Sequence, residues 1–435
     1  MAAIPVDEVK AESLRALAAG DATRALHLQC CIVESAPHDY EARLRIADVL
    51  ARIGATDAAR HAYRGVALFC ARAGRPLPAI VAGRVLGALG GAADEVLDAV
   101  ATLYSADSPT VAQRGARVSI PMGVRVDQRL LAAVPATLEL LSRAAWLAGA
   151  EAGVAFPDRL HAIPLLSSLP REGLARALSA MRVHRLPDRA SVIREGEPGT
   201  SLFLCAGGKL VVFKGEDAKE LGRLGEGALF GEMAVLSGGA RTASIRTDGD
   251  ADLLELGRDP LSEIAAALPT VGEALDRYRR ERLLQNVLAL SPLFRPFSPD
   301  QRVQLLHRFE GLEALDGDVL IRQGEEGRGL FIILDGECEV TRADGDIDVT
   351  VATLHTGDLF GEIALIHDVP ATATVTAAGP ATLLVLDGGH FRKLVESVPD
   401  LRAYFEGLAG DRLRKTGNLL GDEVLLQVAD GLLTG

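Results

Sequence analysis

The chain has 435 residues, of which 48% are hydrophobic and 24% charged, and its formal net charge is −13. Its length predicts two to four domains with cores of their own, and its composition is that of a globular protein rather than a disordered one. The acidic balance argues against a nucleic-acid backbone or an anionic membrane as the main partner, and is compatible with a local basic pocket for a small anion.

The first hundred residues predict a helical region. They are rich in Ala, Leu and Arg with helical periodicity, and β-branched runs are scarce. Gly20 and Gly54 lie 34 residues apart, as do Ala25 and Ala59. This period, with small residues where helices approach each other, resembles that of tetratricopeptide repeats, which stack helix pairs into a protein-binding surface. The alternative is a generic helical bundle that dimerises or simply packs.

A break in the helical pattern follows at 105–127, where "SADSPTVAQRGARVSIPMGVRVD" contains prolines and turn residues and is interpreted as a linker. A helical stretch is expected from about 128 to 155. The apolar windows around 77–103 and 130–155 are interrupted by charged residues, so no membrane span is predicted. The first twenty residues lack a basic stretch followed by an apolar one, so no signal peptide is predicted.

From Pro164 the sequence predicts two copies of one antiparallel β-domain. "ASVIREGEPGTSLFLCAGGKLVVF" alternates apolar and polar residues between glycine turns, and "DVLIRQGEEGRGLFIILDGECEV" repeats the plan further on. Each copy begins with a short helix and ends with helix-like segments, which predicts helix, β-roll and helix in tandem. The turn glycines correspond in pairs: Gly196 and Gly324, Gly199 and Gly327, Gly208 and Gly336.

A fifteen-residue motif occurs once in each copy. "FGEMAVLSGGARTAS" begins at Phe230 and aligns without a gap with "FGEIALIHDVPATAT", which begins at Phe360. The first motif has Arg241 where the second has Ala371. One copy therefore carries a guanidinium that the other lacks.

The first motif has the chemistry to bind a phosphate beside a sugar hydroxyl. Gly231 allows close backbone approach, and the residues after it can form a helical turn whose free N–H groups attract an anion. Glu232 is an acceptor suited to a neutral sugar hydroxyl, and Arg241 offers a planar fork of donors that fits a phosphate. A 3′,5′-cyclic nucleotide presents both groups side by side. A structural ion pair between Glu232 and Arg241, in a roll that binds nothing, is the alternative.

These residues and the glycine-marked roll before them resemble the phosphate-binding cassette of cyclic-nucleotide-binding domains, over roughly 165–414. The resemblance implies that Glu232 binds the ribose 2′-hydroxyl and Arg241 the cyclic phosphate, with Tyr278 one candidate for stacking on the base. It implies cAMP as the favoured ligand. cGMP stays open as the less favoured one, because a hydroxyl at the position of Thr242 favours guanine in some family members. The implied binding residues are Gly231, Glu232, Met233, Ala234, Arg241, Thr242 and Ala243.

The second copy keeps Gly361 and Glu362 but has Ala371 at the arginine position. Burying a phosphate without its charged partner costs on the order of 2–5 kcal/mol. His367 could supply a donor only if the loop rearranged. We therefore expect a degenerate site that is retained as a packing and relay surface.

Tandem rolls behind a helical region and a linker are similar to the regulatory subunit of cyclic-AMP-dependent protein kinase. In that family the linker carries an inhibitor or substrate sequence with arginines ahead of a serine or alanine. Here "QRGARVSIP" supplies Arg114, Arg117 and Ser119, but Ala116 fills one position of the usual basic pair. Three hypotheses follow: a non-enzymatic receptor, a structural scaffold that binds no nucleotide, and a kinase regulatory subunit acting through Ser119. A solvated linker with ordinary arginines is the alternative for this segment.

The sequence thus predicts a multidomain α+β fold in which an N-terminal α-helical, tetratricopeptide-like region precedes two β-roll (jelly-roll) cyclic-nucleotide-binding domains with flanking helices. The expected domains are 1–105 (helical repeats), 106–160 (linker and connecting helix), 161–288 (first binding domain), 289–416 (second, degenerate) and 417–435 (tail).

Other function classes lack support in the sequence. The basic run "RYRRER" has acidic neighbours and is interpreted as a solvated helix face, and about twenty residues after Arg414 are too few for a DNA-reading module. Catalytic signatures and metal-ligand spacings are missing, so no enzyme, cofactor or metal is expected. Five cysteines without a CxxC pair fit a reducing cytoplasm. The expected partners are a cyclic nucleotide and a protein bound by the helical region, with a homodimer left open and neither nucleic acid nor membrane insertion expected.

Overall fold

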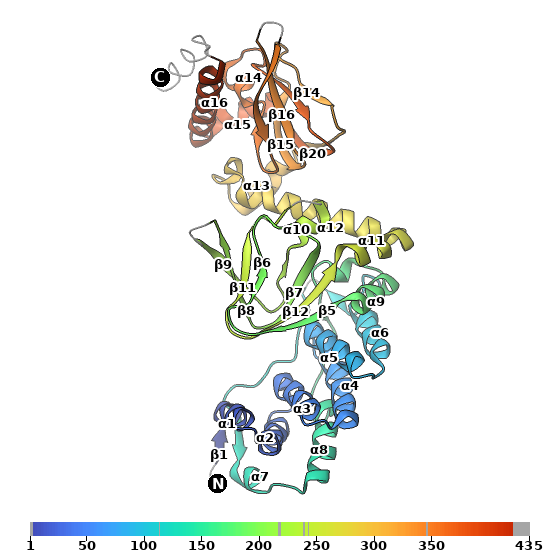
Figure 1. Ribbon diagram of the computed structural model, residues 1–435. Helices are drawn as coiled ribbons and strands as arrows, with labels where there is room; N and C mark the ends of the chain where they lie inside the picture. Colours follow the sequence, from blue (N-terminus) through green and yellow to red (C-terminus); the bar gives the residue numbers. More distant parts are fainter. Residues whose placement is uncertain are drawn as a thin grey trace. The chain divides into compact units, whose positions relative to one another are not determined.

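The computed structural model describes residues 3–112, 114–215, 219–237, 240–241, 243–344 and 347–420 (Figure 1). The chain divides into two compact units, Met1–Tyr278 and Arg279–Gly435. The first unit holds the N-terminal helices and one β-roll, and the second unit holds the other roll. Among the described helices, none combines the length and the apolar character that a membrane crossing needs.

The N-terminal helices pack as three antiparallel hairpins, α1 with α2, α3 with α4, and α5 with α6. Gly20, Gly54 and Gly90 turn the chain inside the three hairpins with φ of +84°, +77° and +76°, a backbone region that favours glycine. The predicted helical region is therefore present, while its assignment to tetratricopeptide repeats stays a prediction. The helices are α1 (Val6–Ala18), α2 (Ala22–Ser35), α3 (Tyr40–Arg52), α4 (Thr56–Arg72), α5 (Pro76–Ala88) and α6 (Ala93–Tyr104).

The segment interpreted as a linker and connecting helix folds back onto these hairpins. Its helices are α7 (Gln128–Ala132) and α8 (Thr137–Gly149), and α8 packs against α2, α3 and α4. Gly65 of α4 and Gly149 approach so closely that a Cβ on either would lie 2.7 Å from the Cα of the other. Only glycine allows this helix crossing, so α8 belongs to the helical core.

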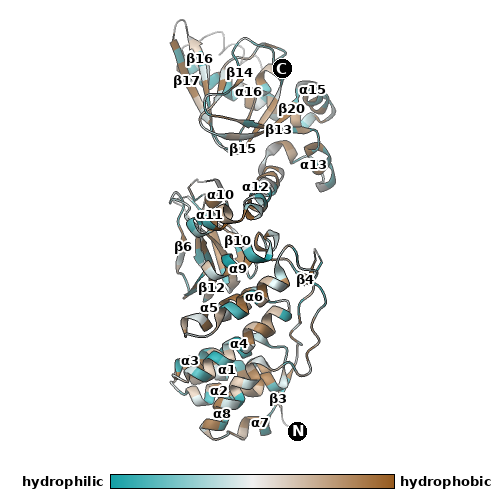
Figure 2. Ribbon diagram, turned by 90° about the vertical axis from the view of Figure 1, so that its right-hand side faces the viewer, coloured by the Kyte–Doolittle hydropathy of each residue, from teal (hydrophilic) through white to brown (hydrophobic). Residues whose placement is uncertain are grey.

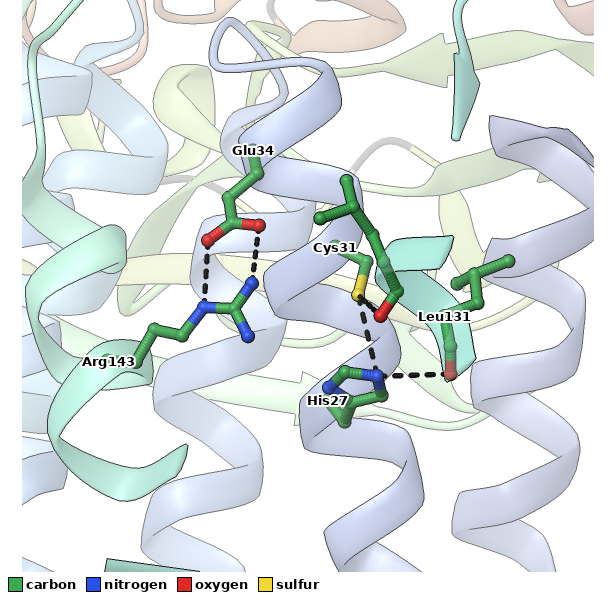
Figure 3. A network of polar contacts seen from close by, with 6 residues as sticks. His27, Cys31, Glu34, Leu131 and Arg143 are labelled. Carbon is green, nitrogen blue, oxygen red and sulfur yellow. Dashed lines mark hydrogen bonds and ion pairs between the residues drawn. The ribbon is translucent and has the colours of Figure 1, made fainter. Parts of the chain in front are cut away.

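Polar contacts also hold α7 and α8 on α2 (Figure 3). Arg143 of α8 donates from Nε to Glu34 at 2.8 Å, and its Nη2 binds the other carboxylate oxygen. His27 hydrogen-bonds through Nε2 to the carbonyl oxygen of Leu131, near the end of α7, at 3.2 Å. Burial raises the pKa of the neighbouring Cys31 thiol to about 11, so the thiol stays protonated at neutral pH.

Short strands tie the rest of this segment down. The antiparallel pair is β1 (Ala3–Pro5) with β3 (Arg125–Asp127), and the parallel pair is β2 (Val111–Ala112) with β4 (Leu160–His161). The N–H of Val118 donates to the carbonyl of Ala73 at 2.8 Å, which docks the chain on the turn between α4 and α5. Val118 is buried, whereas the next residue, Ser119, is exposed.

The first β-roll consists of two four-stranded antiparallel sheets, with strand orders β10-β7-β12-β5 and β6-β11-β8-β9. Helices precede and follow it, and α10 lies between β10 and β11. The strands are β5 (Arg182–Leu186), β6 (Ser191–Ile193), β7 (Ser201–Gly207), β8 (Lys209–Lys214), β9 (Lys219–Gly225), β10 (Leu229–Phe230), β11 (Ser244–Thr247) and β12 (Ala251–Gly257). The helices are η1 (Leu166–Ser168), α9 (Arg171–Ala180), α10 (Glu232–Ser237), α11 (Arg258–Ala267) and α12 (Pro269–Leu290).

Strand β7 explains why the helical region and the first roll form one unit. Side chains alternate along a strand, and both faces of β7 are buried. Phe203 and Cys205 face the core of the roll, while Leu202 and Leu204 join a second core with Ile80 of α5. Helix α5 contacts β5, β7 and β12, and the hydrophobic residues of α5 and α6 are coloured brown in Figure 2. The helices therefore cover the outer face of this sheet.

Ion pairs reinforce the same interface. Arg185 of β5 donates from Nη1 to Asp48 of α3 at 2.7 Å, and the hydroxyl of Tyr63 donates to the same carboxylate at 2.5 Å. Nearby, Glu226 accepts from Arg75 and from the hydroxyl of Tyr40, both at 3.3 Å. The helical region and the roll are thus joined by polar as well as apolar contacts.

The second roll repeats the first, with strand orders β13-β20-β15-β18 and β14-β19-β16-β17. The predicted helix, β-roll and helix in tandem is therefore confirmed. The strands are β13 (Phe309–Ala314), β14 (Val319–Ile321), β15 (Gly329–Asp335), β16 (Cys338–Asp344), β17 (Ile347–Leu354), β18 (Leu359–Phe360), β19 (Thr374–Ala377) and β20 (Ala381–Asp387). The helices are η2 (Pro292–Phe294), α13 (Pro299–Leu306), α14 (Glu362–His367), α15 (Gly388–Ser397) and α16 (Pro399–Leu420).

Candidate functional site

The motif residues of the first copy gather where β10 ends and α10 begins. Phe230 pairs with Phe203 of β7, and their rings stack with centroids 5.5 Å apart. Gly231 follows with φ +74°, and a Cβ there would lie 2.5 Å from Nη1 of Arg241. Both the backbone conformation and this close approach require glycine. The strand end therefore places the start of α10 directly beside the guanidinium.

Arg241 is folded into the roll, and its side chain is 8% exposed. Its Nη1 donates to the carbonyl of Gly231 at 2.8 Å, and its Nη2 donates to the carbonyl of Ser201 at 2.6 Å. Its Cζ lies 5.9 Å from the ring centroid of Phe203. Burial, and next the positive charge of Arg258, lower the pKa of Arg241 from its usual range.

The backbone at Arg241 is fixed by the turn between β6 and β7. The N–H of Arg241 donates to the carbonyl of Glu197, and the N–H of Gly196 donates to the carbonyl of Arg241, both at 2.8 Å. At Gly199, in the same turn, a Cβ would lie 2.1 Å from the Cβ of Ala234 in α10. The turn, the arginine and α10 therefore form one assembly, built around two of the glycines that mark the repeat.

The structure places the other predicted residues around this assembly. Glu232 is the first residue of α10 and is 4% exposed, and Ala234 is 6% exposed. Ala243 is partly buried just before β11. The backbone of Met233 lies in α10, whereas its side chain, like the whole of Thr242, falls outside the described residues. Tyr278, the candidate for stacking on the base, is partly buried against the core that includes Leu261 of α11.

This arrangement can bind a small anion. The guanidinium of Arg241 is buried, and its hydrogen bonds go to neutral carbonyl oxygens. A buried cation gains from a charged partner, and a phosphate fits a guanidinium fork well. The buried acceptor Glu232 and the start of α10 lie on the same short segment. The guanidinium of Arg241 can donate to a phosphate, and the carboxylate of Glu232 can accept from a hydroxyl. The assignment of these residues to a ligand stays a prediction.

The second roll has the same backbone without the guanidinium. Gly361 has φ +90°, and Glu362 is 1% exposed at the start of α14. The N–H of Ala371 donates to the carbonyl of Glu325, and the N–H of Gly324 donates to the carbonyl of Ala371, both at 2.8 Å. These contacts match those at Arg241 in the first roll. The second roll therefore keeps these two backbone contacts but lacks the charged side chain.

Helix α16 supplies a different cation to the second site. Arg412 donates from Nη1 to Oε1 of Glu362 at 2.7 Å. The two residues and Ala371 line a cavity of about 140 Å³ beneath α16, smaller than the 300–1,000 Å³ typical of small-molecule sites. Burial lowers the pKa of His367 at the end of α14, so its ring is neutral at neutral pH and offers no charge for a phosphate. Arg412 is not among the residues predicted from the sequence, because nothing in the sequence places α16 over this cassette.

A second residue that was not predicted from the sequence is Arg258, the first residue of α11. Its Nη2 donates to the carbonyls of Gly199 and Ala234, both at 2.6 Å. The aligned repeats carry one signal that could have found it. The residue that corresponds to Arg258 in the second copy is Gly388, so the repeats differ in a second arginine near the cassette.

Comparison with known proteins identifies the β-rolls. Residues 183–267 and 312–398 match the cyclic nucleotide-binding domain. The chain is 31% identical over 254 residues to cGMP-dependent protein kinase 2 of Mus musculus, which covers 58% of this chain and 32% of that protein. It is 28% identical over 273 residues to the cAMP-dependent protein kinase regulatory subunit of Mycosarcoma maydis, covering 60% of this chain and 50% of that protein.

The solved regulatory domain of Toxoplasma gondii PKA with cAMP is 29% identical to the chain, covers 55% of it and 90% of that domain, and has a TM-score of 0.26. Of the two curated relatives, the chain spans about a third of the length of the cGMP-dependent kinase and half of the length of the regulatory subunit.

Proposed function

Because the chain carries two cyclic-nucleotide-binding domains in tandem and is similar to a regulatory subunit of cAMP-dependent protein kinase, we propose that it is a non-enzymatic cyclic-nucleotide receptor. The first roll binds the nucleotide and the second does not. Binding changes the contacts of the helices that follow the first roll, and the N-terminal helical region passes the change to a partner protein. The five buried, free cysteines are consistent with action in the cytoplasm.

The state of Arg241 carries this proposal. A guanidinium that is 8% exposed and bonded to neutral carbonyls is poised for an anion that enters beside Gly231. A cyclic phosphate would receive its charge-assisted hydrogen bonds, and the ribose hydroxyl would donate to Glu232. cAMP is the proposed ligand, with cGMP as the less favoured one. Gly231, Met233, Ala234, Thr242 and Ala243 complete the proposed cradle through their backbone.

The proposal that the second roll binds no nucleotide depends on Ala371. A cyclic phosphate in that roll would lack the cation that Arg241 supplies in the first. The loss amounts to about 2–5 kcal/mol, or a 30-fold to several-thousand-fold weaker affinity. Arg412, which lines the cavity beneath α16 together with Arg342 and Lys415, already donates to Glu362 at 2.7 Å. The second roll then serves as a packing surface.

Transmission is proposed to start at α10. Val235 of this helix belongs to the same core as Leu261 and Ile264 of α11 and as Ile80 of α5. A ligand that draws α10 inward would bias the packing of that core and so shift the population between two arrangements. The helical region shares this core, so it is placed to sense the shift.

Calorimetric titration of cAMP and cGMP into the purified chain tests the proposal. We expect binding of micromolar or better affinity, weakened at least 30-fold by Arg241→Ala and unchanged by Arg246→Ala. Arg246 is a matched control because it lies exposed on β11 of the same roll, with its Cζ 5.4 Å from the ring centroid of Phe213. No binding to the unmutated chain, after bound nucleotide has been removed, would reject the receptor and favour the scaffold.

A second candidate function is the regulation of a protein kinase through the Ser119 segment. The observation that favours it is the exposure of Ser119 and Arg117 next to the docked Val118. The segment would have to leave the turn between α4 and α5 to enter a kinase in extended form. Phosphorylation or inhibition of a kinase that is lost with Arg117→Ala or Ser119→Ala would support this function, and the absence of both effects would reject it.

A further inference from the structure

Arg258 joins three parts of the first roll at one side chain. Its Nη2 donates to the carbonyl of Gly199 in the turn between β6 and β7 and to the carbonyl of Ala234 in α10, both at 2.6 Å. Its own N–H donates to the carbonyl of Thr200 at 2.8 Å. Arg258 is also the first residue of α11. A single side chain therefore connects the cassette helix with the helix that follows the roll.

This position is unfavourable for a residue with a purely structural role. A cation at a helix N-terminus opposes the helix dipole. Among the residues that the structure describes, the buried Nε of Arg258 finds no hydrogen-bond partner, and such a buried donor carries a cost that calls for an explanation. Arg258 also lies near the guanidinium of Arg241, and its positive charge contributes to the lowered pKa of Arg241. An anion between α10 and Arg241 would relieve this repulsion.

The second roll offers an internal comparison. Gly388 replaces Arg258 at the start of α15, and its N–H donates to the carbonyl of Arg328 at 3.0 Å, which matches the backbone contact in the first roll. Apolar packing between the cassette helix and the following helix is present in both rolls. Val235 of α10 shares a core with Leu261 of α11, and a Cβ on Gly388 of α15 would lie 2.9 Å from Cδ2 of Leu365 in α14. The side-chain bridge to the cassette helix is therefore absent from the roll that also lacks the arginine at position 371.

We propose that Arg258 is a positioning residue that couples the cassette helix α10 to α11 when an anionic ligand binds, and that the second roll has lost this coupling together with its phosphate partner. The proposal rests on the proposed function of the first roll. If α10 moves towards a bound phosphate, the carbonyl of Ala234 moves with it. Arg258 then either follows, which shifts the start of α11, or loses a hydrogen bond. The bridge thereby converts ligand binding into a displacement of the helices that follow the roll.

Hydrogen exchange of the full chain with and without cAMP tests this coupling. In the unmutated chain, cAMP is expected to slow exchange in α10 and in residues 258–278. With Arg258→Met, we expect an affinity within about tenfold of the original and continued protection of α10. The protection of 258–278 should fall at least threefold. Arg246→Met is the matched control and should keep both effects.

The outcomes separate this inference from the proposed function. Absence of cAMP and cGMP binding to the unmutated chain rejects the proposed function and, with it, the coupling. Normal binding with undiminished protection of 258–278 in Arg258→Met rejects the coupling alone. Complete loss of binding in a folded Arg258→Met variant also rejects it, because Arg258 would then be needed for affinity. If the methionine variant is unstable, Arg258→Gln removes the same bridge and has the same expected and contradicting results.

Discussion

Replacing Arg412 with Ala should loosen α16 on the second roll. Glu362 is 1% exposed, whereas its partner Arg412 is 27% exposed, so the substitution leaves a buried carboxylate without its cation. Removing one partner from a fully buried pair costs about 3–5 kcal/mol. Because Arg412 is partly exposed, we expect about 2 kcal/mol, which corresponds to about 30-fold faster exchange of the protected amides in α16.

Hydrogen exchange of peptides from α16 measures this effect locally, which matters because two units need not unfold together. Arg414→Ala is the matched control on the same helix, because the pair that Arg414 forms with Asp411 is 33% and 69% exposed. Its cost should stay under about 0.5 kcal/mol. Adding Glu362→Gln to Arg412→Ala removes the stranded charge and should recover part of the loss. Exchange in Arg412→Ala within twofold of the unmutated chain would refute the reasoning.

Further predictions concern glycine packing, the phosphate partner of the second roll and cysteine burial. Gly65→Ala should destabilise the first unit by about 1–3 kcal/mol in thermal unfolding, because its Cβ would lie 2.7 Å from the Cα of Gly149. Gly407→Ala in α16, where a Cβ meets nothing within 4 Å, should instead stabilise the second unit. If both substitutions changed stability in the same direction, this explanation would be contradicted. Ala371→Arg should create a second nucleotide site, detected as a doubled molar ratio in calorimetry, and an unchanged ratio would show that the loop no longer accepts a phosphate. A disulfide reagent at pH 8 should label the native cysteines much more slowly than the unfolded ones, and rapid native labelling would refute their burial. Burial raises the thiol pKa values to about 12 for Cys30 and Cys70 and to about 11 for Cys31, Cys205 and Cys338.

The helix hairpins and the two rolls could be predicted from the sequence, because glycine positions report the local backbone geometry of their turns. Gly20 and Gly54 have positive φ in the structure, so the turns of two helix hairpins could be placed from glycine alone. The glycines of the two rolls mark close approaches as well as turns. Gly199 and Gly327 both lie against an alanine of the cassette helix, with Cβ distances of 2.1 Å and 2.8 Å. Such positions recur in the sequence because no side chain fits there.

The parts that could not be predicted depend on contacts between distant segments. The crossing of Gly65 and Gly149 is invisible in a segment that resembles a linker followed by a helix. Arg412 lies 50 residues after Glu362, and its carboxylate partner is fixed by how α16 packs. Arg258 donates to backbone carbonyls, which carry no side-chain signature. In these cases, tertiary packing selects the partner.

The number of cyclic nucleotides held by one chain tests the central claim most directly. Native mass spectrometry of the full chain, at a cAMP concentration about ten times the Kd of the unmutated chain, should show one bound nucleotide per chain and a mostly empty Arg241→Ala variant, because its affinity is at least about 30-fold weaker. This result is expected because the guanidinium of Arg241 has only Ala371 as its counterpart in the second roll. Two nucleotides per chain, or one retained after Arg241→Ala, would contradict the account of one sensing roll and one silent roll.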